Sequence, residues 1–182
     1  MTSVAPELSV SRWFNLRGPE PTLSALRSRI VVLHAFQMLC PGCVSHGTPQ
    51  AEKLHKLFAN SGDVVVIGLH TVFEHHTVMT EAALEAFIHE YKLTMPIAVD
   101  QPGENGPQPQ TMQRYAMRGT PSTIVIDRDG IIRDHLFGQA DELALGVLVG
   151  SLAAAPWKPS PRPAEQLQGC ISGRCPTPDG SE

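Results

Sequence analysis

The chain has 182 residues, of which 42% are hydrophobic and 18% are charged, and its formal net charge at pH 7 is −4. This length suits a single domain with a full hydrophobic core, so the fold does not depend on disulfide bonds. Because acidic and basic residues are interspersed along the chain, we expect neither nucleic acid nor a membrane surface as a partner.

The N-terminal residues favour a cytoplasmic protein. Residues 1–8 contain neither the basic region nor the apolar region of a signal peptide, and no apolar run approaches the length of about eighteen residues that a membrane span needs. Permanent structural disulfides are rare in the reducing cytoplasm. We therefore expect a cysteine pair in this chain to be catalytic, redox-sensing or metal-binding.

The first elements lead to a cysteine motif. Residues 8–16 predict a short strand or hairpin, and the apolar, β-branched run Ile30–Phe36 predicts a buried strand. Cys40-Pro41-Gly42-Cys43 follows that strand and opens an amphipathic segment that extends to about residue 60. Proline suits the first position of a helix because its missing N–H would be unpaired there anyway, so Cys40 is predicted to directly precede the helix.

This position predicts different roles for the two sulfurs. The unpaired N–H groups and the positive end of the helix dipole favour a thiolate at Cys40, which is therefore the predicted nucleophile. Residues three apart on a helix are neighbours, so Cys43 is predicted to close a redox-active disulfide with Cys40 and to resolve mixed disulfides. The alternative is half of a structural zinc site, but a Cys-x-x-Cys pair between a strand and a helix favours redox chemistry.

The rest of the chain predicts alternating helices and strands. Pro49 should kink the first helix, and the two apolar strands around that helix predict a parallel βαβ unit. The further predicted elements are a strand at 64–69, a helix at 80–91, a strand at 96–100, a loop at 101–109, a short helix at 111–117, a β-hairpin at 119–137 and a closing helix at 139–155. Core-facing positions are predicted at Ala51, Leu54, Leu57, Phe58, Leu84, Phe87, Ile88, Tyr91, Leu143, Val147, Leu148 and Leu152. This order predicts an α/β sandwich with a mixed sheet.

The chain resembles the thioredoxin fold, and within it the TlpA-like branch of the redoxin (AhpC-TSA-related) family. The resemblance covers residues 5 to about 154. It rests on Ala5-Pro6, Leu26, Val31-Val32-Leu33, Cys40-Pro41-Gly42-Cys43, Gly119-Thr120-Pro121-Ser122-Thr123 and Ile126-Asp127-Arg128-Asp129-Gly130. It implies a three-layer sandwich with helices on both faces of the sheet, an N-terminal hairpin extension, and a domain at residues 1–154 followed by a Pro-rich tail at 155–182.

The resemblance also implies a function and two further site residues. Thr120–Pro121 should be a cis peptide bond beside the cysteines, leaving the neighbouring backbone free to pair with an extended substrate, so Thr120 and Pro121 join Cys40 and Cys43 as candidate catalytic residues. The implied activity is that of a thiol–disulfide oxidoreductase. It would act on a disulfide-containing protein or small molecule, be regenerated by an external thiol reductant, and need no organic cofactor and no metal.

This chain departs from the family pattern beside the cysteines. Leu39 stands where relatives usually carry an aromatic residue, and no acidic residue matches the buried base that would assist Cys43. Glu74 is the one candidate for such a carboxylate. Among the histidines, His34 should satisfy a local hydrogen bond, and His46 could share a helix face with Cys43.

Two other functions remain open from the sequence. Pro41-Gly42-Cys43 also resembles the peroxidatic site of peroxiredoxins, with Cys43 as nucleophile, but Cys40 replaces the usual threonine and Arg118 is near, not at, the usual arginine position. The second alternative is a metal-binding module that uses Cys40, Cys43, Cys170 and Cys175, and a separate metal site could form from His70, His75 and His76.

The C-terminal tail carries its own cysteine pair. Proline-rich residues 156–163 predict an extended linker, and Cys170 and Cys175 follow it. We predict that these two cysteines form a second dithiol, which exchanges with the Cys40–Cys43 disulfide and gains effective concentration from the tether.

Overall fold

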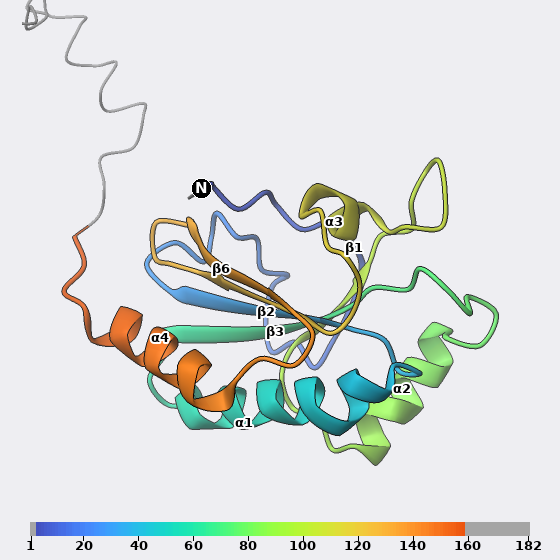
Figure 1. Cartoon of the computed structure of the whole chain (residues 1–182), viewed down its shortest axis with the longest axis horizontal. Coiled ribbons are helices and arrows are strands. Elements are labelled where there is room, and N and C mark those ends of the chain that lie inside the picture. The colour runs from blue at the N-terminus through green and yellow to red at the C-terminus, as the bar shows by residue number, and fades with distance from the viewer. Residues whose placement is uncertain (1–2, 159–182) are drawn as a thin grey trace, which may run out of the picture.

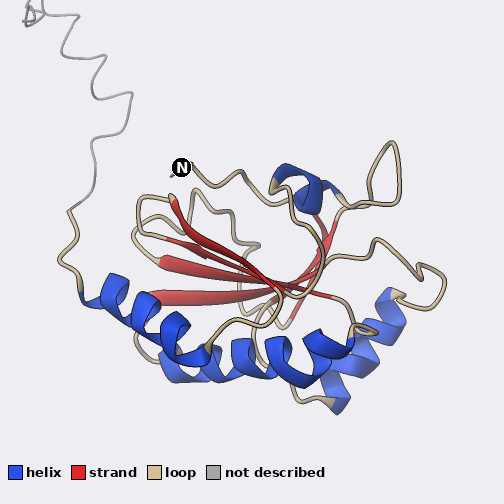
Figure 2. Cartoon of the chain, in the orientation of Figure 1, coloured by secondary structure: helices blue, strands red, loops and turns tan. Residues whose placement is uncertain are grey.

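The computed structural model describes residues 3–158 and shows three layers, as Figure 1 illustrates. A central sheet is covered by α1 (Thr48–Phe58), α2 (Glu81–Glu90) and α4 (Glu142–Ala154) on one face, and by α3 (Gln110–Arg114) on the other. The strands are β1 (Val10–Phe14), β2 (Ile30–Phe36), β3 (Val64–His70), β4 (Ile97–Asp100), β5 (Ser122–Ile126) and β6 (Ile132–Phe137). Figure 2 separates these helices and strands by colour.

The sheet is mixed, in the order β1-β4-β3-β2-β5-β6. β2 pairs in parallel with β3 and antiparallel with β5, and all seven of its residues are buried. A strand that is covered on both faces has no polar side, which explains its continuous apolar sequence. The predicted βαβ unit and the β5–β6 hairpin are both confirmed.

The sheet divides the apolar core into two clusters. The cluster under α1, α2 and α4 includes Phe36, Val66, Leu84, Ile97 and Val149. The cluster on the other face includes Leu33, Leu69, Met112, Tyr115 and Ile124. Because consecutive strand residues point to opposite faces, β2 contributes to both clusters and so joins the two layers.

The N-terminal extension is one strand, so the strand predicted within residues 8–16 is confirmed and the alternative of a hairpin extension is wrong. β1 pairs antiparallel with β4 at the edge of the sheet, with Phe14 opposite Ile97, and it is the one strand in residues 3–29. The chain after β1 carries Pro19 and Pro21. Proline has no N–H to donate to a strand partner, so this segment cannot supply the second half of a hairpin.

Several predicted core positions are exposed. Ala51, Leu54, Leu84 and Ile88 are buried as predicted, but Leu57, Tyr91, Leu143 and Val147 are exposed. In α4 the buried residues are Leu145 and Val149. The predicted Leu148 and Leu152 are partly buried and pack against the core, while 81% of the surface of Leu143 is exposed. The reason is that α4 is apolar on almost every side, so its sequence has no periodicity that could identify the buried face.

The helix after the cysteines continues past Pro49. It widens into a π-helical turn, η1 (Cys43–Gly47), in which the Thr48 N–H donates to the Cys43 carbonyl, and then continues as α1. A proline ring needs room beside the carbonyl four residues earlier, and a π turn provides it. The predicted interruption is therefore a local widening of one helical run.

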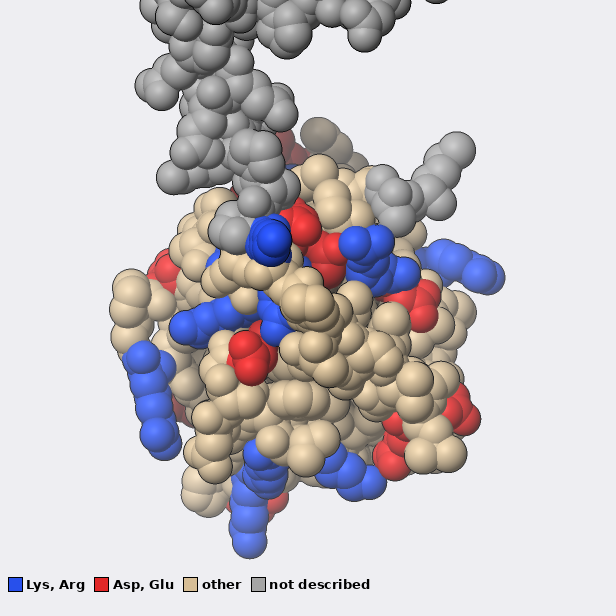
Figure 3. Space-filling view, turned by 90° about the vertical axis from the view of Figure 1, so that its left-hand side faces the viewer, with Lys and Arg blue, Asp and Glu red and all other residues tan. Residues whose placement is uncertain are grey.

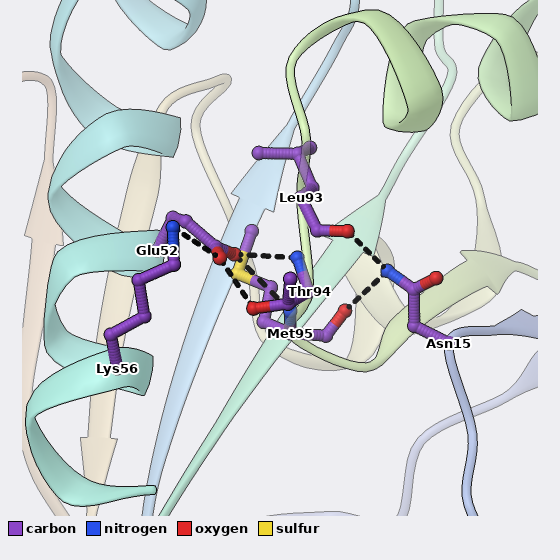
Figure 4. A network of polar contacts seen from close by, with 6 residues as sticks. All are labelled: Asn15, Glu52, Lys56, Leu93, Thr94 and Met95. Carbon is purple, nitrogen blue, oxygen red and sulfur yellow. Dashed lines mark hydrogen bonds and ion pairs between the residues drawn. The ribbon is translucent and has the colours of Figure 1, made fainter.

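The buried carboxylate of Glu52 links α1 to the segment that leads into β4 by hydrogen bonds (Figure 4). Glu52 accepts hydrogen bonds from the backbone N–H groups of Thr94 at 3.0 Å and Met95 at 3.1 Å, and from the Thr94 hydroxyl at 2.5 Å. From the other side, Asn15 donates to the carbonyls of Leu93 and Met95. Burial alone raises the pKa of Glu52, but these hydrogen bonds and nearby Lys56 lower it overall.

We expect Glu52→Ala to lower the free energy of unfolding by about 1–2 kcal/mol, because it removes the acceptor for two backbone donors. The loss stays moderate because Glu52 lines a groove of about 240 Å³ and Thr94 is exposed, so water can replace the carboxylate at the Thr94 donors. Urea denaturation at pH 7 measures the effect, with Lys53→Ala on the exposed side of α1 as the control. Equal stability of the two variants would contradict a structural role for Glu52.

Candidate active site

Cys40 occupies the N-cap position of the helical run. Its carbonyl accepts the first helical hydrogen bond, from the Val44 N–H at 3.0 Å, and its own N–H donates to the Gln37 carbonyl. The Cys40 sulfur accepts the N–H of Cys43 at 3.3 Å. N-cap side chains stabilise helices by accepting this hydrogen bond from the third helical residue. The sulfur of Cys40 thus lies against the positive end of the helix dipole.

Cys43 lies one turn further and has a different environment. Its side chain has no exposed surface, whereas that of Cys40 is half-buried, and both are free thiols in this structure. Burial raises the pKa of the Cys43 thiol to about 12, and the neighbouring Cys40 sulfur adds to the rise. An incoming molecule therefore meets Cys40 first, while Cys43 remains protonated behind it.

The Thr120–Pro121 peptide bond is cis and lies beside the cysteines at the start of β5. The Cys40 thiol donates to the Thr120 carbonyl at 3.4 Å. A Cβ built on Gly42 would lie 3.5 Å from Cδ of Pro121, and one built on Gly47 would lie 3.0 Å from its Cβ. The proline ring therefore packs against the helical run at two positions one turn apart.

The surface around Cys40 combines apolar side chains with one cation. Leu39 has 54% of its surface exposed to solvent, and Phe137 has 49%. Phe137 lies at the end of the edge strand β6, opposite Ser122. The Arg118 guanidinium lies 5.1 Å from the centre of its ring. Leu39, which precedes Cys40, and Phe137, which lies opposite the residue after Pro121, thus provide apolar surface that a polypeptide side chain could cover.

His34 lies below the π turn. Its Nε2 is 3.2 Å from the Thr48 hydroxyl, which confirms the predicted local hydrogen bond, and its ring stacks on Phe36. Nδ1 has no hydrogen-bond partner within residues 3–158. Burial lowers the pKa of His34 to about 4, so the ring is neutral at physiological pH.

The other predicted polar residues lie elsewhere. His46 is exposed and contacts the Ser45 hydroxyl, and Glu74, His75 and His76 are exposed in the loop after β3. His70 is buried against Phe36. In residues 3–158 no three His, Cys, Asp or Glu side chains converge as a metal site would require. The tail cysteines, Cys170 and Cys175, lie outside the described residues.

The sequence did not indicate two residues that shape this site. Gly47 allows His34 and Pro121 to approach the helix, and the Gln37 carbonyl holds the backbone of Cys40. A glycine inside a predicted helix usually weakens it, and this is the one signal that could have identified Gly47 as a point of close approach.

Two further observations concern the charge of the protein surface and the length of the helices. On the end of the molecule shown in Figure 3, acidic and basic side chains are interspersed without a region of one sign. Among the described helices, none is long and apolar enough to cross a lipid bilayer.

Comparisons with known proteins agree with this geometry. The model of the AhpC/TSA family matches residues 1–135. The crystal structure of a thioredoxin-like superfamily protein is 50% identical, with a TM-score of 0.80, and the match covers 84% of this chain and 97% of that chain. The structure of a thiol-disulfide isomerase from Corynebacterium glutamicum is 49% identical, with a TM-score of 0.77 and coverage of 84% and 98%. Thioredoxin-like protein YneN from Bacillus subtilis (strain 168) is 28% identical over 130 residues, which are 71% of this chain and 67% of that protein. The chain belongs to the AhpC/TSA family.

Proposed function

We propose that this protein is a thiol–disulfide oxidoreductase in which Cys40 is the nucleophile and Cys43 the resolving cysteine. The observation that carries the proposal is the contrast between the two sulfurs. Cys40 is accessible and accepts an N–H at the start of a helix, while Cys43 is buried with a raised pKa. Similarity to a thiol-disulfide isomerase supports the same chemistry.

The reaction proceeds by two exchanges. The Cys40 thiolate attacks a substrate disulfide, forms a bond to one substrate sulfur and releases the other as a thiolate. Cys43 then loses its proton and attacks the Cys40 sulfur, which releases the second substrate thiolate and leaves the Cys40–Cys43 disulfide. An external thiol reductant returns both cysteines to the dithiol form.

The proposed substrate is an extended polypeptide that carries a disulfide. The Thr120 carbonyl lies within hydrogen-bond distance of the Cys40 thiol, so backbone beside Pro121 is next to the reacting sulfur. The exposed side chains of Leu39, next to Cys40 in the chain, and of Phe137, opposite Ser122 in the sheet, offer apolar surface. A polypeptide bound there places its disulfide within reach of Cys40.

Insulin reduction and peroxide consumption, measured on three variants, test the proposal. We expect Cys40→Ser to lower insulin reduction by about two orders of magnitude or more, because Cys43, the other cysteine within residues 3–158, is buried and cannot replace the nucleophile. Cys43→Ser should form a stoichiometric mixed disulfide with substrate but not turn over. Ser45→Ala, an exposed change on the same turn, should leave the rate unchanged. Peroxide consumption that survives the loss of Cys40 but not of Cys43 would instead establish a peroxiredoxin-like peroxidase.

A further inference from the structure

We propose that Arg118 binds a carboxylate of the substrate polypeptide, so that the protein prefers disulfides with an acidic residue nearby. This inference rests on the proposed function, because it names the class of disulfide that Cys40 attacks. The arginine lies near the reacting sulfur in the chain, its guanidinium contacts an aromatic ring, and it takes part in no ion pair within residues 3–158.

Arg118 lies in the segment that leads into β5, two residues before Thr120. The Thr120 carbonyl is 3.4 Å from the Cys40 sulfur, so this segment passes directly beside the reacting atom. The α carbons of two residues in such positions are at most about 7 Å apart. Met117 and Gly119, on either side of Arg118, are buried, whereas Arg118 itself is exposed. Its side chain therefore starts close to Cys40 and is accessible from solvent.

The ring of Phe137 restricts the arginine side chain. The ring centre is 5.1 Å from Cζ of Arg118, within the range of a cation–π contact. A Cβ built on Gly119 would lie 3.0 Å from Cε2 of the same ring, so the ring packs against the backbone between Arg118 and Thr120. A guanidinium that is already ordered loses less conformational entropy when it binds a partner. The contact with Phe137 thus prepares Arg118 for binding.

The positive charge of Arg118 has no carboxylate partner in the described part of the chain. Arg12 pairs with Glu81 and Arg133 pairs with Asp127, but none of the ion pairs in residues 3–158 includes Arg118. A guanidinium binds a carboxylate through two parallel hydrogen bonds. The exposed N–H groups of Arg118 are therefore available to a carboxylate of an incoming polypeptide.

The position of Arg118 limits where that carboxylate lies in the substrate. Residues two to four positions from a cysteine in an extended chain lie about 7–13 Å from it. This interval matches the two-residue separation of Thr120 and Arg118 together with part of the arginine side chain. The substrate class is therefore a polypeptide with Asp or Glu two to four residues from a disulfide cysteine. Because the net charge of the chain is −4, a preference for acidic substrates must come from a local cation and not from general attraction.

Matched peptides test this inference. Each probe is a disulfide-linked dimer of a short peptide with one cysteine and with Glu, or Gln in the control peptide, two, three or four residues from it. Single-turnover reduction by prereduced protein gives a second-order rate constant, measured by chromatography of the released peptide thiol. We expect the wild-type protein to reduce at least one Glu peptide about three- to fivefold faster than its Gln counterpart at low ionic strength, as for an exposed ion pair. The ratio should fall towards one in about 1 M NaCl, because salt screens exposed charges.

Three variants separate substrate choice from other roles of the arginine. Arg118→Gln should lower the ratio to about one and reduce the Gln peptides at a rate within about twofold of wild type, with an unchanged pH profile. Arg118→Glu should instead prefer peptides with Lys in place of Glu. Arg17→Gln is the matched control, because it removes the same charge from an exposed position after β1, at the opposite edge of the sheet. This control should keep the full ratio.

The remaining outcomes distinguish this inference from the proposed function. A wild-type ratio of one at every position, or a preference that persists in Arg118→Gln, would overturn the inference. An equal loss for Glu and Gln peptides in Arg118→Gln, or a shifted pH profile, would do the same, because the arginine would then act on Cys40 or on the fold. In each of these cases, reduction of the Gln peptides by the wild-type protein leaves the oxidoreductase intact. Reduction of neither the peptides nor insulin would refute the proposed function itself.

Discussion

Replacing Gly47 by alanine should lower the free energy of unfolding by about 2 kcal/mol, even though alanine is the better helix former. An added Cβ would lie 2.6 Å from Cε1 of His34 and 3.0 Å from Cβ of Pro121. Both neighbours are buried and fixed, His34 by the stacked Phe36 ring and Pro121 by the helix itself. The helical run must therefore move away from the sheet, which also shifts Cys40 from Thr120 and should lower insulin reduction.

Gly146→Ala in α4 is the matched control, because nothing lies within 4 Å of its added Cβ. There the same chemical change should raise stability by about 0.5–1 kcal/mol. Urea unfolding of the two variants at pH 7 compares them directly. If Gly47→Ala proved as stable as Gly146→Ala, the close approach of His34 and Pro121 would have no energetic consequence.

The folded protein should lose stability when the pH falls below about 6.5. Burial lowers the pKa values of His34 and His70 to about 4, whereas unfolded histidine titrates near 6.5. Between these values the unfolded chain binds more protons than the folded chain, so stability decreases as the pH decreases. Each histidine should lower the free energy of unfolding by roughly 2 kcal/mol by pH 5. Both rings pack against Phe36, so the two losses arise in the same part of the core.

His70→Leu isolates one of these contributions. Nε2 of His70 has no partner within the described residues, so leucine removes a titrating group without breaking a hydrogen bond of that atom. The variant should lose about half of the stability change between pH 6.5 and 5, measured by urea unfolding at several pH values. His89→Gln, a change at an exposed position on α2, should keep the full change. An unaltered pH dependence in His70→Leu would show that His70 is not the group responsible.

The local parts of the fold could be predicted because they depend on neighbouring residues. The continuous apolar run Ile30–Phe36 indicates a strand covered on both faces, and Pro41 identifies the first helical position after Cys40. Both conclusions need only a few consecutive residues. The β5–β6 hairpin is equally local, because Gly130 provides the left-handed conformation in its turn, with φ of 71°.

The parts that the sequence did not reveal depend on residues far apart in the chain. β1 finds its partner in β4, about ninety residues later, so no local pattern could distinguish this edge strand from a hairpin. The network around Glu52 joins α1 to Asn15 and to the segment before β4. In α4 the apolar surface extends all round, and the packing of Leu145 and Val149 against the sheet, not the pattern, selects the buried face.

The sulfur of Cys40 is both the reacting atom and the N-cap of its helix. The stability of the helix is therefore linked to the reduction potential of the Cys40–Cys43 pair. Whatever free energy the Cys43 N–H gives to the thiolate is given to the reduced protein and not to the oxidised one. By the same amount the protein becomes a better acceptor of electrons and a weaker donor. The residues at the N-terminal end of this helix therefore also influence whether the protein oxidises or reduces its disulfide partners.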